Sequence, residues 1–249
     1  MTNDRTPERN RDDIYALPLD SLTAFAFDEK VARVFPDMIE RSVPGYASII
    51  AMTGVLADRY AQPNTRCYDL GCSWGASTQA MRRHLDGRDC TIVAVDNSPA
   101  MIEQCRRALA AEPHATPVEL IEGDLTAIPF ENASVVVLNF TLQFVPLAER
   151  APLLQRIAQA MRPGGVLILS EKICFEDPHL QQLNSELHHA FKRGNGYSDL
   201  EISQKRTAIE NVLVPETIAT HQQRLRDAGF TSVDVWFQCF NFASLVALR

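Results

Sequence analysis

The 249-residue sequence lacks the segments that carry proteins into or across a membrane. No apolar run approaches the ~18 residues that a spanning helix needs. The first residues, MTNDRTPERNRDD, are polar and include acids, so they lack the apolar core of a signal peptide. We therefore expect a cytoplasmic protein that makes no contact with a membrane.

The sequence also has no cysteine or histidine spacing that is typical of a metal or redox site. None of its 6 cysteines forms a C-x-x-C pair, so we expect reduced and partly buried thiols. The adjacent histidines, His188 and His189, lie on a predicted helix and would point to different faces. We expect no metal site. We interpret Cys72 as part of the wall of a site, because no histidine lies close in sequence to activate its thiol.

Basic residues are too few and too dispersed for a nucleic-acid surface. The chain has 24 Lys and Arg against 31 Asp and Glu, which gives a formal net charge of −7. Its longest basic runs are pairs, such as Arg82-Arg83 and Lys205-Arg206. A protein that grips a phosphate backbone needs a basic stripe or patch. We therefore expect no direct binding of nucleic acid.

Phosphate-binding loops are missing as well. There is no G-x-x-x-x-G-K-[ST] run, and Ser73 stands where a G-x-G-x-x-G fingerprint would have its second glycine. What is present is YDLGCSWGAST, residues 68–78, which follows a strand-like run and opens a helix. Asp96 closes the next strand 25 positions after Gly71. This pattern is typical of an open α/β sheet that holds a nucleoside at the carboxyl ends of its strands. The form D-x-G-C-S-x-G indicates S-adenosylmethionine (SAM), which carries no phosphate.

Strands and helices alternate along most of the chain, which predicts a parallel sheet buried on both faces. We expect an α/β, Rossmann-like SAM-binding fold with a seven-stranded, mostly parallel sheet and an antiparallel last strand. Residues 1–20 are interpreted as a disordered lead-in and 21–249 as a single domain. That domain would include a helical cap at 21–60, cut into short pieces by Pro36 and Pro44, and a helical insertion at 174–220. The expected strands are 66–70, 91–96, 118–124, 134–140, 166–172, 232–238 and 242–248.

Three polar residues stand at predicted strand ends, each with a structural alternative. Asp96 can accept hydrogen bonds from both ribose hydroxyls, or stabilise the start of a helix. Asp124 can accept from the adenine amino group, with the Leu125 N–H beside it, or be a turn residue. Asn139 ends an apolar strand, where an amide is costly unless bonded. It can bind the amino-acid part of the cofactor, or be a satisfied buried amide.

A cation on the insertion is the least expected of the candidate residues. A helix is predicted over 199–214, and Arg206 lies on the same face as Ile202, Ile209 and Leu213. A guanidinium on an apolar stripe needs an anionic partner, which is either a ligand or a structural acid. Lys205 borders that face and is the alternative cation. Tyr46 follows Pro44-Gly45, so a tight turn can aim its ring into a site, or it can be a core aromatic.

Taken together, these segments resemble the bacterial carboxy-S-adenosylmethionine (carboxy-SAM) synthases, which prepare a carboxymethyl donor for wobble-uridine modification of tRNA. The resemblance covers roughly residue 27 to the end, and Trp74 is bulkier than the aliphatic residue expected at its position. The matching stretches are FDEKVARVFPDMIERSVPGY, YDLGCSWGAST, DNSPAMIEQCRR, NASVVVLNFTLQF, LSEK, FKRGNGYSDLEISQKR and WFQCFNFASLVAL.

The resemblance implies a role for each candidate. Arg206 would pair with the added carboxylate and Tyr46 would contact the charged tail, so these two are the candidate catalytic residues. Asp96 and Asn97 would hold the ribose, Asp124 and Leu125 the adenine, and Asn139 would face the sulfonium. The cofactor-binding residues are then Tyr46, Gly71, Cys72, Ser73, Asp96, Asn97, Asp124, Leu125, Asn139 and Arg206.

The resemblance also implies a reaction and its partners. Prephenate would aromatise to phenylpyruvate with loss of CO2 and its hydroxyl, the departing hydroxide would take a methyl proton from SAM, and the resulting carbanion would capture the CO2. The relatives are homodimers, and a separate tRNA carboxymethyltransferase would use the product. Two other hypotheses remain open at this point: a SAM-dependent methyltransferase that acts on a small molecule, and a SAM-binding protein without catalysis.

Overall fold

A seven-stranded sheet forms the centre of the computed structural model, which describes residues 10–18, 24–210 and 212–249. The strand order is β3-β2-β1-β4-β5-β7-β6. Strands β1 to β5 pair in parallel, and β7 runs antiparallel to both β5 and β6. The predicted fold class, including the antiparallel last strand, is confirmed. The strands are β1 Thr65–Leu70, β2 Cys90–Asp96, β3 Val118–Glu122, β4 Ala133–Asn139, β5 Met161–Lys172, β6 Ser232–Cys239 and β7 Phe242–Leu248.

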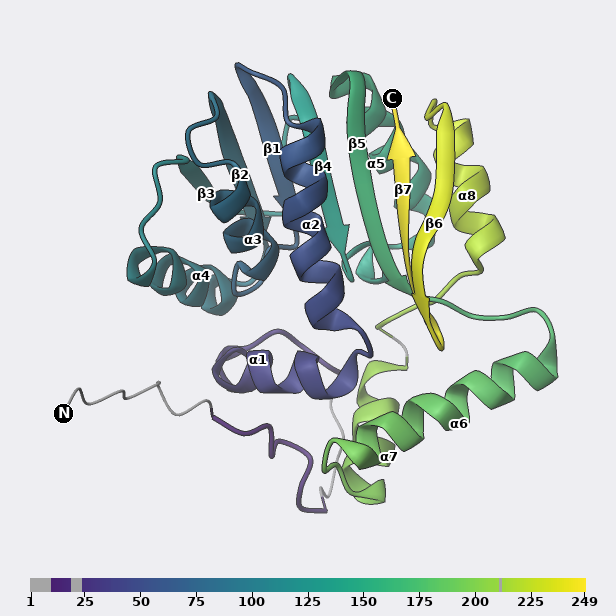
Figure 1. Ribbon diagram of the computed structural model, residues 1–249. Coiled ribbons are helices and arrows are strands. Elements are labelled where there is room, and N and C mark those ends of the chain that lie inside the picture. The colour runs from purple at the N-terminus through teal and green to yellow at the C-terminus, as the bar shows by residue number, and fades with distance from the viewer. Residues whose placement is uncertain (1–9, 19–23, 211) are drawn as a thin grey trace.

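Helices cover both faces of this sheet, and a separate group of helices lies beyond one end of the strands (Figure 1). Alternate residues of β4 face opposite layers: Val135 and Val137 join a core with α2 and α3, whereas Val136 and Leu138 join a core with α5 and α8. Burial on both sides explains why β4 reads as a continuous apolar run. The helices are α1 Glu29–Ser42, α2 Tyr46–Tyr60, α3 Ala76–His84, α4 Pro99–Ala111, α5 Leu147–Ala160, α6 Pro178–Gly194, α7 Asp199–Ile209 and α8 Ile218–Asp227, with a 3₁₀ turn at Leu142–Phe144.

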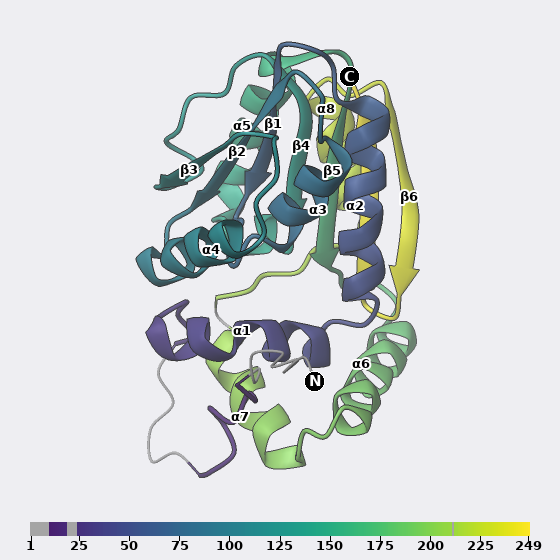
Figure 2. The same cartoon turned by 60° about the vertical axis from the view of Figure 1, so that its left-hand side comes forward.

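The strand order places a topological switch point between β1 and β4. From β1 the chain moves outward through β2 and β3, and it then returns to the other side of β1 with β4 and β5. Ligands of open α/β sheets bind outside the carboxyl ends of the strands at such a point. The cap helix α1 and the insertion helices α6 and α7 lie beyond these carboxyl ends (Figures 1 and 2). These helices therefore cover the ends of the strands where a ligand is expected to bind.

Some predicted helix breaks and strand ends differ from the structure. Pro36 lies inside a single helix α1 and does not cut it, because a proline removes one backbone bond while Val34, Phe35 and Met38 stay buried along one face. Pro44 does mark a break, since Gly45 adopts a φ of +78° between α1 and α2. The last predicted strand residues at 123–124 and 140 lie beyond the ends of β3 and β4.

The expected lead-in at 1–20 also differs in part. Residues 1–9 and 19–20 lie outside the described residues, but 10–18 pack against the cap and the insertion. Asp12 is 2 % exposed and accepts a hydrogen bond of 2.5 Å from the Tyr197 hydroxyl. Its backbone N–H donates to Asp37 at 2.7 Å. This segment is therefore ordered by a buried carboxylate that composition alone does not reveal.

Two sequence expectations concern absences. In the described part of the chain, no helix combines the length and apolar character needed to span a bilayer. Across the same residues, no three His, Cys, Asp or Glu side chains gather in a group suited to a metal ion.

Candidate functional site

A cavity of ≈ 680 Å³ lies between the carboxyl ends of the strands and the helices α1, α6 and α7. Its size is within the range of small-molecule sites. The structure brings all ten predicted site residues to its wall, although they come from six separate parts of the sequence. They are Tyr46, Gly71, Cys72, Ser73, Asp96, Asn97, Asp124, Leu125, Asn139 and Arg206.

The loop after β1 bends sharply across the end of β2. Gly71 has a φ of +78°, and a Cβ at this position would lie 2.3 Å from the hydroxyl oxygen of Thr141. The N–H groups of Gly71 and Cys72 both donate to the Val95 carbonyl, at 2.8 and 2.9 Å. Only glycine fits this approach without strain. The backbone of the loop therefore lies against the cavity with no side chain between them.

Asp96 both shapes this loop and faces the cavity. One carboxylate oxygen accepts from the Ser73 N–H and the other from the Ser98 N–H, each at 2.9 Å. Burial raises the pKa of Asp96, and these backbone bonds partly offset the shift. The helix-start role weighed for this residue is thus present at α4, where Ser98 is the N-cap. Each carboxylate oxygen has further acceptor capacity, so a ribose hydroxyl can bind the same group.

Asp124 and Asn139 differ in how much bonding capacity they retain. Asp124 is exposed, and its Oδ1 accepts from the N–H and the hydroxyl of Thr126, both at 2.8 Å, which is the turn arrangement weighed above. The Asn139 amide donates to the hydroxyls of Thr53 at 3.2 Å and Ser77 at 2.9 Å, while its oxygen accepts from Ser170 at 2.6 Å. The structure therefore favours the satisfied-amide alternative for Asn139, with a second lone pair on its oxygen left for a ligand.

Tyr46 is the first residue of α2, directly after Gly45. Its ring centroid lies 6.1 Å from that of Phe140 on the cavity wall. Burial, and then the charge of Asp69, raise the pKa of the Tyr46 phenol well above its usual range. The hydroxyl therefore stays protonated and can donate a hydrogen bond to an anionic group.

The two neighbouring cations of α7 have opposite environments. Lys205 is 7 % exposed, and its ammonium lies 3.2 Å from the Ser42 hydroxyl and 3.7 Å from the Asp12 carboxylate. Arg206 is exposed at the cavity wall and has no side-chain hydrogen bond or ion pair with any described residue. Among the described residues the structural-acid alternative therefore applies to Lys205 and not to Arg206. Helix α7 ends at Ile209, so Leu213 reaches the cavity from the chain beyond it and not from a shared helix face.

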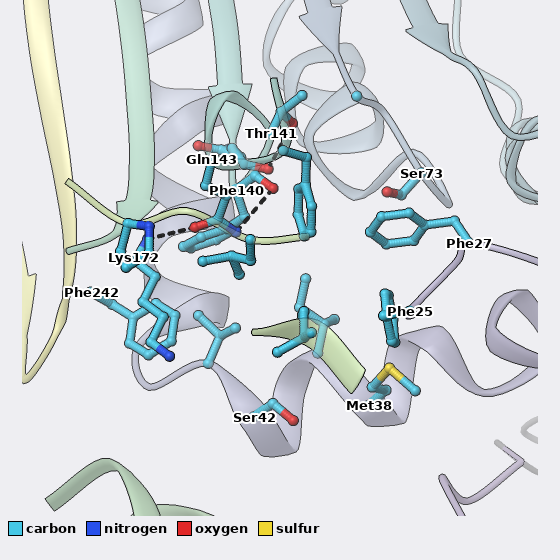
Figure 3. A pocket seen from close by; sticks show the side chains of 18 of the residues that line it. Phe25, Phe27, Met38, Ser42, Ser73, Phe140, Thr141, Gln143, Lys172 and Phe242 are labelled. Carbon is cyan, nitrogen blue, oxygen red and sulfur yellow. Dashed lines mark hydrogen bonds between the residues drawn. The ribbon is translucent and has the colours of Figure 1, made fainter. Parts of the chain in front are cut away.

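Other wall residues were not predicted from the sequence. Aromatic rings of Phe25, Phe27, Phe140 and Phe242 make much of the wall apolar (Figure 3). Gln143 accepts from the Lys172 N–H at 2.9 Å and donates to the Phe140 carbonyl at 3.3 Å, which joins the ends of β4 and β5 (Figure 3). Phe27, Phe140, Gln143 and Phe242 lie in stretches that match the family, but no spacing or polarity pattern marks them as site residues.

Trp74 does not line the cavity, although it lies in the cofactor loop. Its indole N–H donates to the Ala32 carbonyl of α1 at 2.7 Å, and its ring packs with the cap residues. The bulky side chain therefore ties the loop to the cap.

Comparison with known proteins identifies close relatives over almost the full length. A family model described as a methyltransferase domain matches residues 68–165. The carboxy-S-adenosyl-L-methionine synthase of Geobacter sp. (strain M21) is 60% identical over 242 residues, which is 97% of this chain and 99% of that protein. The synthase of the same name from Trichlorobacter lovleyi is 61% identical over the same shares. That of Klebsiella pneumoniae subsp. pneumoniae is 55% identical over 96% of this chain and 97% of that protein.

Solved structures share the fold at low identity. Human N-acetylserotonin methyltransferase in complex with SAM matches with a TM-score of 0.58 and 17% identity, over 89% of this chain and 55% of that one. An O-methyltransferase family protein from Burkholderia thailandensis matches with a TM-score of 0.62 and 21% identity, over 90% and 60%. At this level of identity, these structures show that the fold is shared and say nothing about the reaction.

Proposed function

Because the chain belongs to the carboxy-S-adenosyl-L-methionine synthase family, we propose that it converts SAM to carboxy-SAM with prephenate as the source of CO2. Prephenate loses its ring carboxylate as CO2 and its hydroxyl as hydroxide, which leaves phenylpyruvate. The SAM methyl group loses a proton to that hydroxide and gains the CO2. The products are carboxy-SAM, phenylpyruvate and water, so atoms and charge balance. The observation that carries the proposal is Arg206, a cavity cation with no partner among the described residues.

The wall residues fit SAM in chemical type. Gly71 provides a close backbone approach that a Cβ would fill. Acceptors for the ribose and adenine come from Asp96 and Asp124, and the Asn97 and Leu125 backbones lie beside them. The aromatic wall suits an apolar stretch of ligand, and the protonated Tyr46 hydroxyl suits a charged tail. The acids also complement the positive sulfonium.

The protein's contribution to the chemistry is placement and exclusion of water. Aromatic side chains enclose the reacting groups, so CO2 is captured before it escapes or meets solvent. Arg206 supplies a planar fork of donors for the carboxylate that forms. No side-chain base is needed, because the hydroxide that leaves prephenate accepts the proton.

Methyl transfer to a small molecule is the alternative from the same fold. It would leave Arg206 without a role, since a transferred methyl group offers no acceptor for a guanidinium. A binding protein without catalysis would not need the apolar enclosure. Carboxylation therefore accounts for more of the cavity than either alternative.

Turnover separates these hypotheses directly. The purified protein, mixed with SAM and prephenate, is expected to release a nucleoside heavier than SAM by one CO2, together with phenylpyruvate in equal amount. Mass spectrometry and the absorbance of phenylpyruvate measure both products. A reaction without prephenate is the control and should leave SAM unchanged. Formation of S-adenosylhomocysteine with a small-molecule acceptor, and no carboxylated product, would contradict the proposal.

Loss of either nucleoside-side carboxylate is expected to weaken SAM binding. A charge-assisted hydrogen bond contributes ~1.5–3 kcal/mol, so Asp96→Ala and Asp124→Ala should each raise the Kd for SAM roughly 10- to 150-fold. Asp96→Ala should have the larger effect, because Asp96 also fixes the Ser73 N–H of the loop. Calorimetric titration measures the affinities, with the exposed Asp58→Ala as the control. Unchanged affinity in both variants would disprove the assigned SAM orientation.

The partners of this reaction are also part of the proposal. With a net charge of −7, the chain should leave tRNA to a separate carboxymethyltransferase that uses carboxy-SAM. A homodimer is supported by α6, where Leu180, Leu183 and Leu187 are 37% to 49% exposed at helical spacing. Sedimentation equilibrium measures the assembly state.

A further inference from the structure

Lysine is scarce in this chain and concentrated at one place. The sequence has 4 lysines and 20 arginines. Three of the lysines, Lys172, Lys192 and Lys205, line the cavity, although they come from β5, α6 and α7. The fourth, Lys30, is exposed in the first turn of α1. Outside the cavity, Lys30 is the one lysine of the sequence and arginine carries most of the positive charge, so lysine is concentrated in the cavity.

Two of these ammonium groups have no partner among the residues that the structure describes. Lys205 is engaged with Asp12 and Ser42, as described above. The side chains of Lys172 and Lys192 make no hydrogen bond or ion pair there, although Lys192 is only 8 % exposed. Lys172 extends from the end of β5 past the ring of Phe242 (Figure 3). Among the described residues, neither of these two cations therefore has an acid that pairs with it alone.

This arrangement is costly for the protein alone. Burial lowers the pKa of Lys172, and burial together with the neighbouring charges of Lys205 and Lys172 lowers that of Lys192 to about 7. The acid near Lys192 is Asp12, which already serves Lys205 and Tyr197. Buried charges without a partner destabilise a fold. An anionic ligand is the partner that would offset the cost.

Lys172 lies away from the nucleoside end of the cavity. Asp96 ends β2 and Lys172 ends β5, and the strand order puts three strand spacings between them, roughly 14 Å. Beside the lysines, the His188 ring donates to the Ser42 carbonyl at 2.8 Å, and burial lowers its pKa to about 3. His188 is therefore neutral, so the positive charge here belongs to the lysines.

We propose that Lys172 and Lys192 form the subsite for the 2-oxo carboxylate of the CO2 donor, the carboxylate that remains on the product. This inference rests on the proposed function. The donor carries two carboxylates, and the one that is transferred must lie next to the SAM methyl group and Arg206. The retained one is at the end of a flexible oxo-acid chain, which needs its own anchor. Two ammonium groups in the same cavity would fix that chain and leave the ring free to aromatise.

The test compares Lys192→Met and Lys172→Met with the matched control Lys30→Met. Each cavity variant is expected to raise the KM for prephenate roughly 10- to 150-fold, the scale of a charge-assisted hydrogen bond, with a smaller change in kcat. Binding of phenylpyruvate to the enzyme loaded with carboxy-SAM should weaken by a similar factor, because phenylpyruvate keeps the same carboxylate. The affinity for SAM alone should change less than about twofold. Lys192→Arg should restore part of the phenylpyruvate affinity.

The measurements separate this inference from the function on which it rests. Phenylpyruvate binding needs no turnover, so it tests the subsite even if the protein fails to carboxylate SAM. The inference is wrong if phenylpyruvate does not bind the wild-type protein, or binds the cavity variants as tightly. It is also wrong if the variants lose SAM affinity in parallel, because the lysines would then hold the nucleoside. Both variants should melt no lower than the wild type, since each removes an uncompensated charge.

Discussion

Arg206→Ala is expected to weaken carboxy-SAM binding by about 2–4 kcal/mol, roughly 30- to 700-fold, and to leave SAM affinity nearly unchanged. The arginine fork can form two parallel hydrogen bonds with a carboxylate, and it stays charged at any working pH. The methyl group of SAM has no acceptor for this fork. Because Arg206 has no partner among the described residues, its removal leaves no other group unpaired. The discrimination between the two ligands should therefore disappear with little loss of stability.

Calorimetric titration of both nucleosides against wild type, Arg206→Ala and Arg206→Lys measures this discrimination. The lysine variant should keep only part of the preference, since an ammonium lacks the planar fork. Arg193→Ala is a suitable control, because this arginine pairs with Asp199 on the exposed side of the insertion. Equal losses for SAM and carboxy-SAM would make Arg206 a general contributor to the pocket, and the argument for carboxylation would lose its main support.

The parts of the cavity that could be predicted are those set by short-range backbone geometry. Gly71 is identified by the turn it permits, and Asp96 by its place at the end of the next strand. Both positions follow from the strand pattern alone, because parallel strands end at the same edge. The same argument places Asp124 and Asn139 there, but it does not say how each side chain is bonded. For Asn139 the partners Thr53, Ser77 and Ser170 come from three distant segments, which no local pattern specifies.

The parts that could not be predicted depend on tertiary packing. Lys172 and Lys192 are ordinary residues in the sequence, and they line the same cavity only because the insertion folds over the end of β5. Asp12 lies in a polar N-terminal segment that composition predicts to be disordered. Its carboxylate nevertheless pairs with Lys205, which is distant in the sequence. Helix α7 ends at Ile209, and beyond it Val214 donates to the Gln143 carbonyl at 3.0 Å. In each case a long-range contact outweighs the local preference.

Glu216→Ala is expected to destabilise the protein by about 3–5 kcal/mol, the scale for a buried ion pair that loses one partner. Arg150 is 0 % exposed, and its guanidinium pairs with Glu216 while donating to the carbonyls of Gln143, Val145 and Val214. Without the carboxylate, this guanidinium would stay buried without its ion-pair partner. Thermal unfolding should show a midpoint lower by roughly 6–20 °C. Asp58→Ala is the matched control, because its pair with Arg88 is exposed and should contribute less than about 1 kcal/mol.

The pH dependence of the free energy of unfolding is a second test of the contribution of Glu216. Burial alone would raise the pKa of Glu216, but hydrogen bonds from Arg224 and Arg150 outweigh it and lower the value. A carboxyl group with a lowered pKa stabilises the fold above its unfolded value and loses that contribution as pH falls through the folded value. The gap between wild type and Glu216→Ala should therefore shrink below about pH 4.5. Gln143 and Val145, whose carbonyls accept hydrogen bonds from Arg150, also line the cavity. Because the ion pair between Arg150 and Glu216 holds this part of the wall in place, the variant should bind SAM more weakly near neutral pH. A constant gap across this pH range would assign the stabilisation to packing of the side chain and not to its charge.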